Sequence, residues 1–512
     1  MKVLYIAAEC KPFSKTGGVG DVAGELPLAL RSQGVDIEIV TPWYGRTAIV
    51  DARLSFQGRS EDVGLVRTDL QGIPVNFIKN PTHFEFDYSE GKNRPKFPED
   101  QPPFKTDHLY RKDYSTPYVE SDSSMPFIDD ALRFSFFSRA CLDLIERKKP
   151  DIVHANDWVL GYLFGWMAMK GMRSRRVLTI HNIGYQGNIG RDLIRGWQIE
   201  DLAGDRTLGP LFTDPRPAWR SVNALRLAME LADAVNTVSP TYKKEMTQPE
   251  DQNRYFEGGK GLDEVAARLD GQRKLHGILN GFGYKFAPDR GHLEKTLAAK
   301  AEMKAELSQR FPNPGGLLFG FVGRAVEQKF KLLAEKIGNK SVLDHLLEIE
   351  GVNMAIVATG QKEYERILEG LRGRPNVDIT IAFDPVKARQ ISLGSDVFLM
   401  PSVFEPCGIT QMESMSVATP PLVRWTGGLV DTVRRHTPSA PGTGFGFDGS
   451  SRQEVLENLV KAARQAVDLY TNHPAEFRKM QEGGFRERFS WVDAARAYIQ
   501  QVYEPTCAAQ AR

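Results

Sequence analysis

The feature that most constrains the fold is an alternation of short apolar runs with longer amphipathic segments, repeated in two series. Strands separated by helices form parallel sheets. The sequence therefore predicts an α/β protein of two doubly wound domains, with helices at segments such as 263–275 and 363–372. The apolar runs that predict strands are 3–7, 37–40, 151–155, 177–180 and 234–238 in the first half, and 317–323, 354–359, 377–383, 396–402 and 420–425 in the second.

The chain has 512 residues, more than a single typical domain of roughly 100–200 residues. The polar, turn-rich stretch 240–290 is expected to join the two series. We predict a first domain at 1–245, a linker region at 246–285 and a second domain at 286–485. The Pro-rich, charged stretch 79–105 predicts loops or a short hairpin, and it fits a lid and a surface insertion about equally well.

Composition excludes several classes of function. A formal net charge of +1 disfavours a general nucleic-acid binder. The four cysteines lie far apart, which disfavours a zinc site or a disulfide framework and favours a reducing cytoplasm. There is no run of about 18 apolar residues, and the opening MKVLYIAAE predicts a strand rather than a signal peptide. We expect a cytoplasmic protein without a transit peptide, while a plastid or another compartment stays open.

A glycine-rich turn follows the first predicted strand. Lys15 precedes Gly17, Gly18 and Gly20, and Asp21 follows them. A P-loop places its lysine after the glycines, and a dinucleotide loop needs G-x-G-x-x-G, so this turn is neither. Its N–H groups and the following helix start favour an anion. A phosphate site and a tight strand–helix turn are both compatible with the pattern.

Two cations follow the strand predicted at 317–323. Arg324 and Lys329 lie just beyond its carboxyl end, where open parallel sheets bind their ligands. Such a pair suits a diphosphate, and a solvated basic turn is the alternative.

The stretch 396–420 carries the strongest signal. A strand is expected to end at Ser402, and the turn 404–408 leads to a helix from about Ile409. The start of that helix offers free N–H groups to an anion. Glu405, between Phe and Pro, is poorly explained as a surface charge and is a candidate for binding sugar hydroxyls. Glu413, inside the helix, is also explained as an ordinary exposed residue.

Polar residues also follow the strand predicted at 177–180. His181 and Asn182 lie at its carboxyl end, before a glycine-containing turn. A ligand contact and a structural histidine explain this placement about equally well. The stretch 154–158, His-Ala-Asn-Asp-Trp, forms a similar polar and aromatic edge after another predicted strand.

Taken together and in this order, these motifs resemble those of the bacterial glycogen synthases and plant starch synthases. Lys-Thr-Gly-Gly at 15–18 and Phe-Glu-Pro-Cys-Gly at 404–408 are specific to that group. Arg…Lys at 324–329 and Glu-x7-Glu at 405–413 are shared by many retaining glycosyltransferases. The resemblance covers nearly the whole chain. Further matching segments are 157–158, 181–187, 238–242, 279–281, 426–429 and 489–491.

The resemblance implies a GT-B fold, in which two Rossmann-like domains face a deep cleft and a helix at 486–512 crosses back to the first domain. It implies transfer of glucose from ADP-glucose to the non-reducing 4-OH of an α-1,4-glucan or maltooligosaccharide, with retention. No metal and no cofactor are expected, because side-chain cations and helix N-termini can neutralise the leaving diphosphate. No nucleic-acid or membrane partner is expected, and the oligomeric state stays open.

The resemblance also assigns residues to the site by their positions in the motifs. Catalytic roles are implied for His181 beneath the anomeric centre, Glu405 at the glucose hydroxyls, Arg324 and Lys329 on the diphosphate, and Lys15 near the phosphates and the acceptor. Substrate binding is further implied for Gly18, Asp21, Asn182, Asn280, Gly408, the N–H groups of Ile409 and Thr410, the base-stacking Phe383, and Tyr110 on the sugar side.

Several positions depart from the family pattern. Val159 replaces a usual histidine, Gly283 a usual acid, Phe330 a usual glycine, Val403 a usual arginine, and Phe383 a usual tyrosine. A UDP-glucose donor, a small oligosaccharide acceptor and a non-catalytic glycan- or nucleotide-binding relative therefore stay open as alternatives. A phosphorylase is disfavoured because no pyridoxal-phosphate lysine motif is evident.

Overall fold

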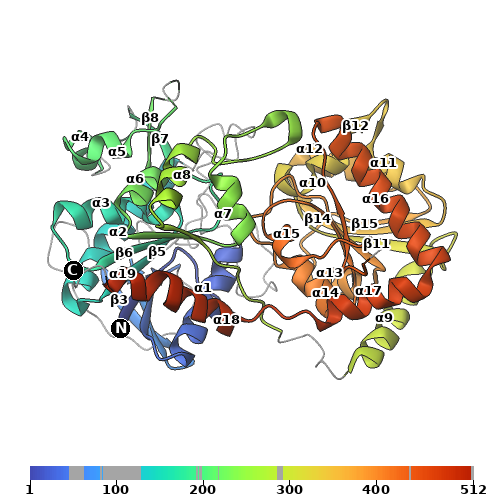
Figure 1. Cartoon of the computed structure of the whole chain (residues 1–512), viewed down its shortest axis with the longest axis horizontal. Helices are drawn as coiled ribbons and strands as arrows, with labels where there is room; N and C mark the ends of the chain where they lie inside the picture. Colours follow the sequence, from blue (N-terminus) through green and yellow to red (C-terminus); the bar gives the residue numbers. More distant parts are fainter. Residues whose placement is uncertain are drawn as a thin grey trace, which may run out of the picture.

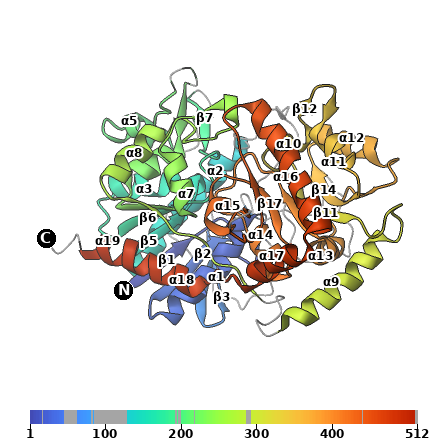
Figure 2. The same cartoon turned by 45° about the vertical axis from the view of Figure 1, so that its right-hand side comes forward.

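The computed structural model comprises two α/β domains, and the end of the chain returns to the first of them (Figure 1). In Figure 2 the returning helices α18 (Trp491–Ala497) and α19 (Glu504–Ala508) again lie beside the first domain. Within the described residues, no helix has both the length and the apolar character that a bilayer crossing requires. The structure describes residues 1–15, 17–44, 63–80, 84, 128–191, 194, 199–216, 218, 220–284, 292–437 and 440–508.

The first domain is built on an eight-stranded sheet in the order β10-β9-β6-β5-β1-β2-β4-β3. Neighbouring strands run parallel, except that β3 is antiparallel to β4. The central strands are almost fully buried because helices cover both faces of a parallel sheet. The strands are β1 (Lys2–Ile6), β2 (Asp36–Pro42), β3 (Gly64–Leu70), β4 (Ile73–Lys79), β5 (Ile152–Asn156), β6 (Arg175–Ile180), β9 (Ala234–Thr237) and β10 (Leu275–Gly277).

Helices α1 to α8 surround this sheet, together with a small antiparallel pair formed by β7 and β8. The start of α7 is set locally, because Ser239 Oγ accepts the N–H of Tyr242 at 3.2 Å and Pro240 fits the first turn. The bounds are α1 (Gly18–Ser32), α2 (Ile128–Lys148), α3 (Gly161–Met169), α4 (Glu200–Gly204), α5 (Leu208–Phe212), α6 (Ala224–Leu231), α7 (Pro240–Met246), α8 (Asp263–Gly271), β7 (Asn188–Gly190) and β8 (Ser221–Asn223).

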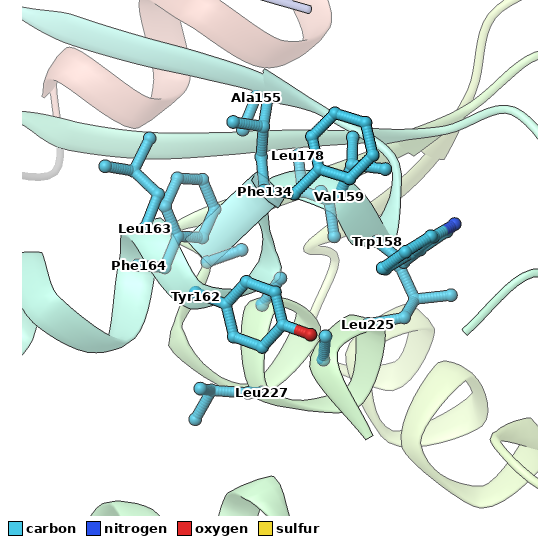
Figure 3. Packing of buried hydrophobic residues seen from close by; sticks show 14 of the residues in the cluster. Phe134, Ala155, Trp158, Val159, Tyr162, Leu163, Phe164, Leu178, Leu225 and Leu227 are labelled. Atoms are coloured by element: carbon cyan, nitrogen blue, oxygen red, sulfur yellow. The ribbon is translucent and has the colours of Figure 1, made fainter. Parts of the chain in front are cut away.

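A dense apolar cluster joins α2, α3 and α6 to one face of the first sheet (Figure 3). Phe134 of α2 meets Trp158 edge to face, with ring centroids 5.9 Å apart. Val159, beside Trp158, is 2% exposed. This packing holds the carboxyl ends of β5 and β6, from which the polar residues of the first domain emerge, on a rigid base.

The second domain has a six-stranded, fully parallel sheet in the order β15-β14-β11-β16-β17-β18. A two-stranded antiparallel sheet, β12 with β13, lies apart from it. The strands are β11 (Leu317–Ala325), β12 (Lys336–Ile337), β13 (Lys340–Ser341), β14 (Val352–Gly360), β15 (Val377–Thr380), β16 (Val397–Met400), β17 (Pro421–Arg424) and β18 (Phe445–Phe447). The helices are α9 (Leu293–Ser308), α10 (Glu327–Ala334), α11 (Val342–Leu347), α12 (Lys362–Leu371), α13 (Pro385–Gly394), α14 (Thr410–Ser416), α15 (Gly428–Thr432), α16 (Arg452–Asn472) and α17 (Pro474–Arg486).

The chain leaves the second domain after α17 and packs its last elements on the first. α18 continues into a π-helical segment, Tyr498–Tyr503, and then into α19. The side chains of Tyr498, Val502 and Tyr503 are fully buried, in one core cluster with Val3 and Tyr5 of β1. The first domain is therefore completed by the end of the chain.

The structure confirms the α/β class, and every strand that the alternation predicts is present. The alternation missed β3 and β4, which are seven residues long and form one edge of the first sheet. It also missed the strands of two or three residues, β7, β8, β10, β12, β13 and β18. β10 pairs with β9, so the first sheet extends into the range 246–285 that the sequence assigns to the linker. Residues 81–83 and 85–105, most of the stretch expected to form loops or a hairpin, lie outside the described residues.

Candidate active site

The two domains meet at α7 of the first and at the turns that follow β16 and β17 of the second. Ser239 Oγ donates a hydrogen bond to Pro406 O at 2.6 Å. The N–H and the hydroxyl of Thr241 both donate to the Asp431 carboxylate, at 2.9 and 2.8 Å. The Glu245 carboxylate accepts the N–H of Gly427 at 2.8 Å. α7 is thus bonded directly to the turn that carries Glu405.

The glycine-rich turn gathers charge at the start of α1. Lys15 forms an ion pair with Asp21, and Lys11 Nζ lies 3.1 Å from the same carboxylate. The N–H of Gly17 donates to Glu9 Oε2 at 3.2 Å, and Gly18 is the first residue of the helix. Two lysines therefore share the Asp21 carboxylate, while the Glu9 carboxylate is bonded to the backbone of the turn.

This turn lies close to the second domain. Burial raises the pKa of the Glu413 carboxyl on α14, and the charges that act on it include Arg389 of its own domain and Lys15, Asp21 and Lys11 of the first. Charges act appreciably on one another only over short distances. Lys15 and α14 thus face each other across the domain junction.

Lys329 and Glu405 come together at the carboxyl edge of the second sheet. Lys329, in the first turn of α10, forms an ion pair with Glu405, which also accepts a hydrogen bond from Ser402 Oγ at 3.0 Å. Glu405 is 6% exposed. Arg324 lies near the end of β11 with its side chain exposed. Two cations and a shielded carboxylate thus occupy one edge, as the sequence predicts.

Two glycines shape the backbone around Glu405. Gly427 has a φ of +48°, and a Cβ there would lie 2.0 Å from Glu405 O, so a side chain would displace the turn. Gly408 has a φ of +72° and leads to Ile409, the residue that precedes α14, and to Thr410, the first residue of α14. The turn can follow this path only with residues that lack a Cβ at these points.

His181 lies at the end of β6, held from two sides. Its backbone N–H donates to Asp157 Oδ1 at 2.7 Å, and its ring Nε2 lies 2.9 Å from Asn156 Oδ1. Burial lowers the pKa of the His181 ring to about 4. Burial raises the pKa of Asp157 to about 7, opposed by bonds from the N–H groups of His181 and Asn182. Asp157 has a φ of +60°, a strained conformation of the kind found at functional sites.

Two asparagines predicted for the site are also fixed locally. Asn182 Oδ1 accepts the N–H of Gly184 at 2.9 Å, which shapes the turn after His181. Asn280 is 4% exposed and forms a hydrogen bond with the thiol of Cys407 on the other domain. Its Oδ1 is buried and has no hydrogen-bond partner in the part of the chain that the structure describes. Burial raises the pKa of that thiol to about 12.

The remaining predicted residues differ in their placement. Phe383 is 70% exposed in the segment between β15 and α13, which suits a stacking surface. Phe330, in contrast, is buried inside α10, where its ring lies 5.6 Å from that of Phe321 and 5.4 Å from that of Tyr364. Its bulk therefore fills the second core rather than narrowing a loop. Tyr110 lies outside the described residues.

Comparison with known proteins identifies the family. Residues 2–268 match the family model described as the starch synthase catalytic domain, and residues 304–477 match the model for glycosyl transferases group 1. A glycogen synthase of Geotalea daltonii is 34% identical to the chain, with 100% of both chains covered. The chain belongs to the glycogen and starch synthase family. This synthase is therefore a glucosyltransferase of the GT-B fold.

Two further relatives agree with this assignment. A glycogen synthase of Lactococcus lactis is 34% identical to this synthase, with 98% of this chain and 100% of the relative covered. The catalytic domain of starch synthase IV from Arabidopsis thaliana, solved with ADP and acarbose, superposes with a TM-score of 0.74 at 26% identity, with 99% of each chain covered.

Several residues around the synthase site were not foreseen from the sequence. Glu9 and Lys11 join the glycine-rich turn, and Glu245 and Asp431 tie α7 to the second domain. Glu9 could have been found from the sequence, because it is a charged residue at the end of the first apolar run. The partners of Glu245 lie more than 180 positions away in the sequence, so no local pattern could indicate them. Within the described residues, no group of three or more His, Cys, Asp or Glu is arranged to hold a metal ion.

Proposed function

We propose that this synthase transfers glucose from ADP-glucose to the non-reducing 4-OH of an α-1,4-glucan, with retention of the anomeric configuration. The observation that carries the proposal is the meeting of Lys329, Glu405 and Arg324 at one sheet edge. Lys15 lies near that edge, close enough to Glu413 to act on its pKa. A sugar diphosphate is the ligand that needs both cations and a carboxylate at such short range.

The proposed chemistry is electrostatic. Arg324, Lys329 and Lys15 neutralise the charge that develops on the diphosphate as the bond to glucose breaks. Glu405 accepts hydrogen bonds from the glucose hydroxyls and so orients the sugar. The acceptor hydroxyl attacks from the face that the diphosphate leaves and gives its proton to the departing phosphate oxygen, so the configuration is retained. Further contacts to the donor are assigned to Gly18, Asp21, Asn182, Asn280 and Gly408, to the N–H groups of Ile409 and Thr410, and to Tyr110.

His181 suits the position beneath the anomeric centre because its ring is neutral near physiological pH. Its pKa of about 4 keeps a positive charge away from a carbon that itself becomes positive in the transition state. The same ring remains able to form hydrogen bonds.

Phe383 suits stacking with a nucleotide base, and the choice of adenine rests on the relatives. A large aromatic side chain with 70% exposure is unusual on a protein surface and offers a flat face to a base. The Arabidopsis starch synthase IV domain was solved with ADP. We therefore assign ADP-glucose as the donor and Phe383 as the stacking residue.

The experiment is a comparison of labelled ADP-glucose and UDP-glucose as donors, with glycogen and with maltotriose as acceptors. The proposal expects incorporation into glycogen, with a higher kcat/KM for ADP-glucose. A higher kcat/KM for UDP-glucose would overturn the donor assignment, and transfer to maltotriose alone would overturn the acceptor. Binding of ADP in calorimetry without transfer from either donor would identify a non-catalytic relative. Phe383→Ala should raise the KM for ADP-glucose while leaving the KM for glycogen unchanged.

A further inference from the structure

A row of buried polar side chains crosses one face of the first sheet, directly beneath His181. The row contains Tyr5 of β1, Asn156 of β5, Thr179 of β6 and Asn236 of β9. In the sheet register Asn156 is opposite Thr179, and Thr179 is opposite Asn236. Tyr498, near the C-terminus, bonds to two members of the row. Its OH lies 3.2 Å from Thr179 Oγ1 and 2.7 Å from Asn236 Nδ2. Buried hydrogen-bonded networks restrict the side chains that they join, although Asn236 Oδ1 has no partner among the described residues.

The orientation of the Asn156 amide is fixed by its surroundings. The side chain is 1% exposed, and its Nδ2 donates to Ile6 O at 2.9 Å. A backbone carbonyl can only accept, so the atom that faces Ile6 O must be the NH₂ group. The carbonyl oxygen Oδ1 then faces the two remaining neighbours, Tyr5 OH at 3.0 Å and His181 Nε2 at 2.9 Å.

This orientation determines where the proton of the His181 ring lies. An amide oxygen can only accept hydrogen bonds, so Nε2 must donate and therefore carries the proton. Nδ1, which has no hydrogen-bond partner among the described residues, is left as the acceptor of the ring. We propose that Asn156 is a positioning residue that holds His181 in the Nε2–H tautomer and leaves Nδ1 free to accept a hydrogen bond from the bound sugar. The inference rests on the proposed place of His181 at the donor glucose.

The groups around the ring are consistent with a neutral His181. The backbone N–H of His181 donates to Asp157, whose own pKa is raised to about 7 by burial with a contribution from Glu9. His154, on the same strand as Asn156, has its pKa lowered to about 3 by burial, with His181 as a further cause. Tyr5 is a neutral donor with a pKa raised well above its usual value. No ionised acid is bonded to Nε2, so nothing at that atom favours the imidazolium.

The tautomer can be read without any assay of transfer. Nitrogen-15 shifts of the histidine rings distinguish Nε2–H from Nδ1–H, and the His181 signal is assigned as the one lost in His181→Gln. The proposal expects an Nε2–H ring for His181 in the wild-type protein. An Nδ1–H ring or an imidazolium at neutral pH would overturn it, whether or not the protein transfers glucose. If transfer is absent but the Nε2–H ring is found, the proposed function fails and the assignment of Asn156 stands.

The role of Asn156 is tested by removing its oxygen. Asn156→Leu should shift the His181 signal towards Nδ1–H or a mixture and lower kcat by about 10–100-fold, with KM for the donor little changed. Asn236→Leu is the matched control, because it replaces a buried asparagine on the same face that does not touch His181. It should retain the Nε2–H signal. Equal effects of the two variants on the His181 signal, or an unchanged signal in Asn156→Leu, would overturn the proposal. Tyr5→Phe removes a hydroxyl but leaves Asn156 Oδ1 in place. The His181 ring should therefore remain in the Nε2–H form in this variant, even if the other two variants fold poorly.

Discussion

Lys329 and Glu405 neutralise each other at the edge of the second sheet, although one belongs to α10 and the other follows β16. Both side chains are largely shielded, at 24% and 8% exposure. Removing one partner of a shielded pair leaves the other charge uncompensated. Under the proposed function, a diphosphate that binds Lys329 competes with Glu405 and releases the carboxylate to the sugar.

The first prediction follows from this pair. Lys329→Ala and Glu405→Ala should each lower kcat by about 100-fold or more, because Lys329 is a proposed contact to the diphosphate and Glu405 a proposed contact to the glucose. The double variant should be little worse than the poorer single variant, because residues that act together are not additive. Steady-state rates with thermal unfolding curves check this. Near-normal activity of both folded single variants would contradict the site assignment.

The second prediction concerns the buried Phe330. Phe330→Ala should destabilise the second domain by about 3–5 kcal/mol, the usual cost of emptying a large aromatic site in a core. Phe330→Leu should lower the stability of this domain much less, because leucine fills most of the same space. Denaturant unfolding measures both, and the KM for the donor should be similar to that of the wild type in the folded fraction. If Phe330→Ala leaves stability intact and changes the KM instead, the ring acts at the site rather than in the core.

The third prediction uses the buried carboxyl of Glu257. Tyr242 OH donates to Glu257 Oε2 at 3.1 Å, and Glu257 Oε1 has no hydrogen-bond partner within the described residues. Burial raises the pKa of this carboxyl to about 8. An unfolded glutamate releases its proton near pH 4.3. Between that pH and about 8 the folded state binds more protons than the unfolded state, so stability contributed by this group falls as pH rises.

Glu257→Gln keeps an acceptor for Tyr242 and stays neutral at every pH. Its melting temperature should therefore exceed that of the wild type by on the order of 3 °C at pH 8.5 and differ little at pH 5. Glu264→Gln, an exposed change on helix α8, is the control and should give a small offset that does not grow with pH. A constant difference between Glu257→Gln and the wild type would show that Glu257 is already ionised at low pH.

The fourth prediction concerns the contact between the domains. Glu245 accepts from Gly427 N and from Thr426 Oγ1, and Gly428, next in the chain, donates to Glu405 O at 2.9 Å. Glu245→Ala should loosen this turn and lower kcat/KM for the donor by about 10-fold. Glu245→Gln, which retains an acceptor for Gly427, should recover most of the loss. Lys244→Ala, an exposed change on the same helix, should have no effect on donor kinetics.

Much of the fold could be predicted because its information is local. The apolar runs of β11 and β14 are long and buried on both faces, so composition alone marks them as strands. β10 and β18 are short and contain glycine, and only pairing with a neighbouring strand makes them part of a sheet. Their existence depends on tertiary contacts that a single segment does not encode.

The site, like the fold, has a part that local sequence predicts and a part that depends on tertiary contacts. Lys15, Arg324, Lys329 and Glu405 were predicted because ligands of parallel sheets bind at strand ends, and motifs mark those ends. The support for His181 could not be predicted, because Asn156 acts through an amide whose orientation depends on Ile6 of another strand. Phe330 replaces a usual glycine, and its burial could not be predicted, because it depends on helix α10 beginning early enough to turn the ring into the core.

The return of the last helices to the first domain affects how a ribosome can produce this molecule. Growing chains ordinarily fold their domains in the order of synthesis. Here Tyr498, Val502 and Tyr503 belong to the same core as Val3 and Tyr5. The domain that is translated first is thus left with an open apolar face until the whole second domain has been made. A premature stop near the end of the gene would damage the part of the protein that was synthesised earliest.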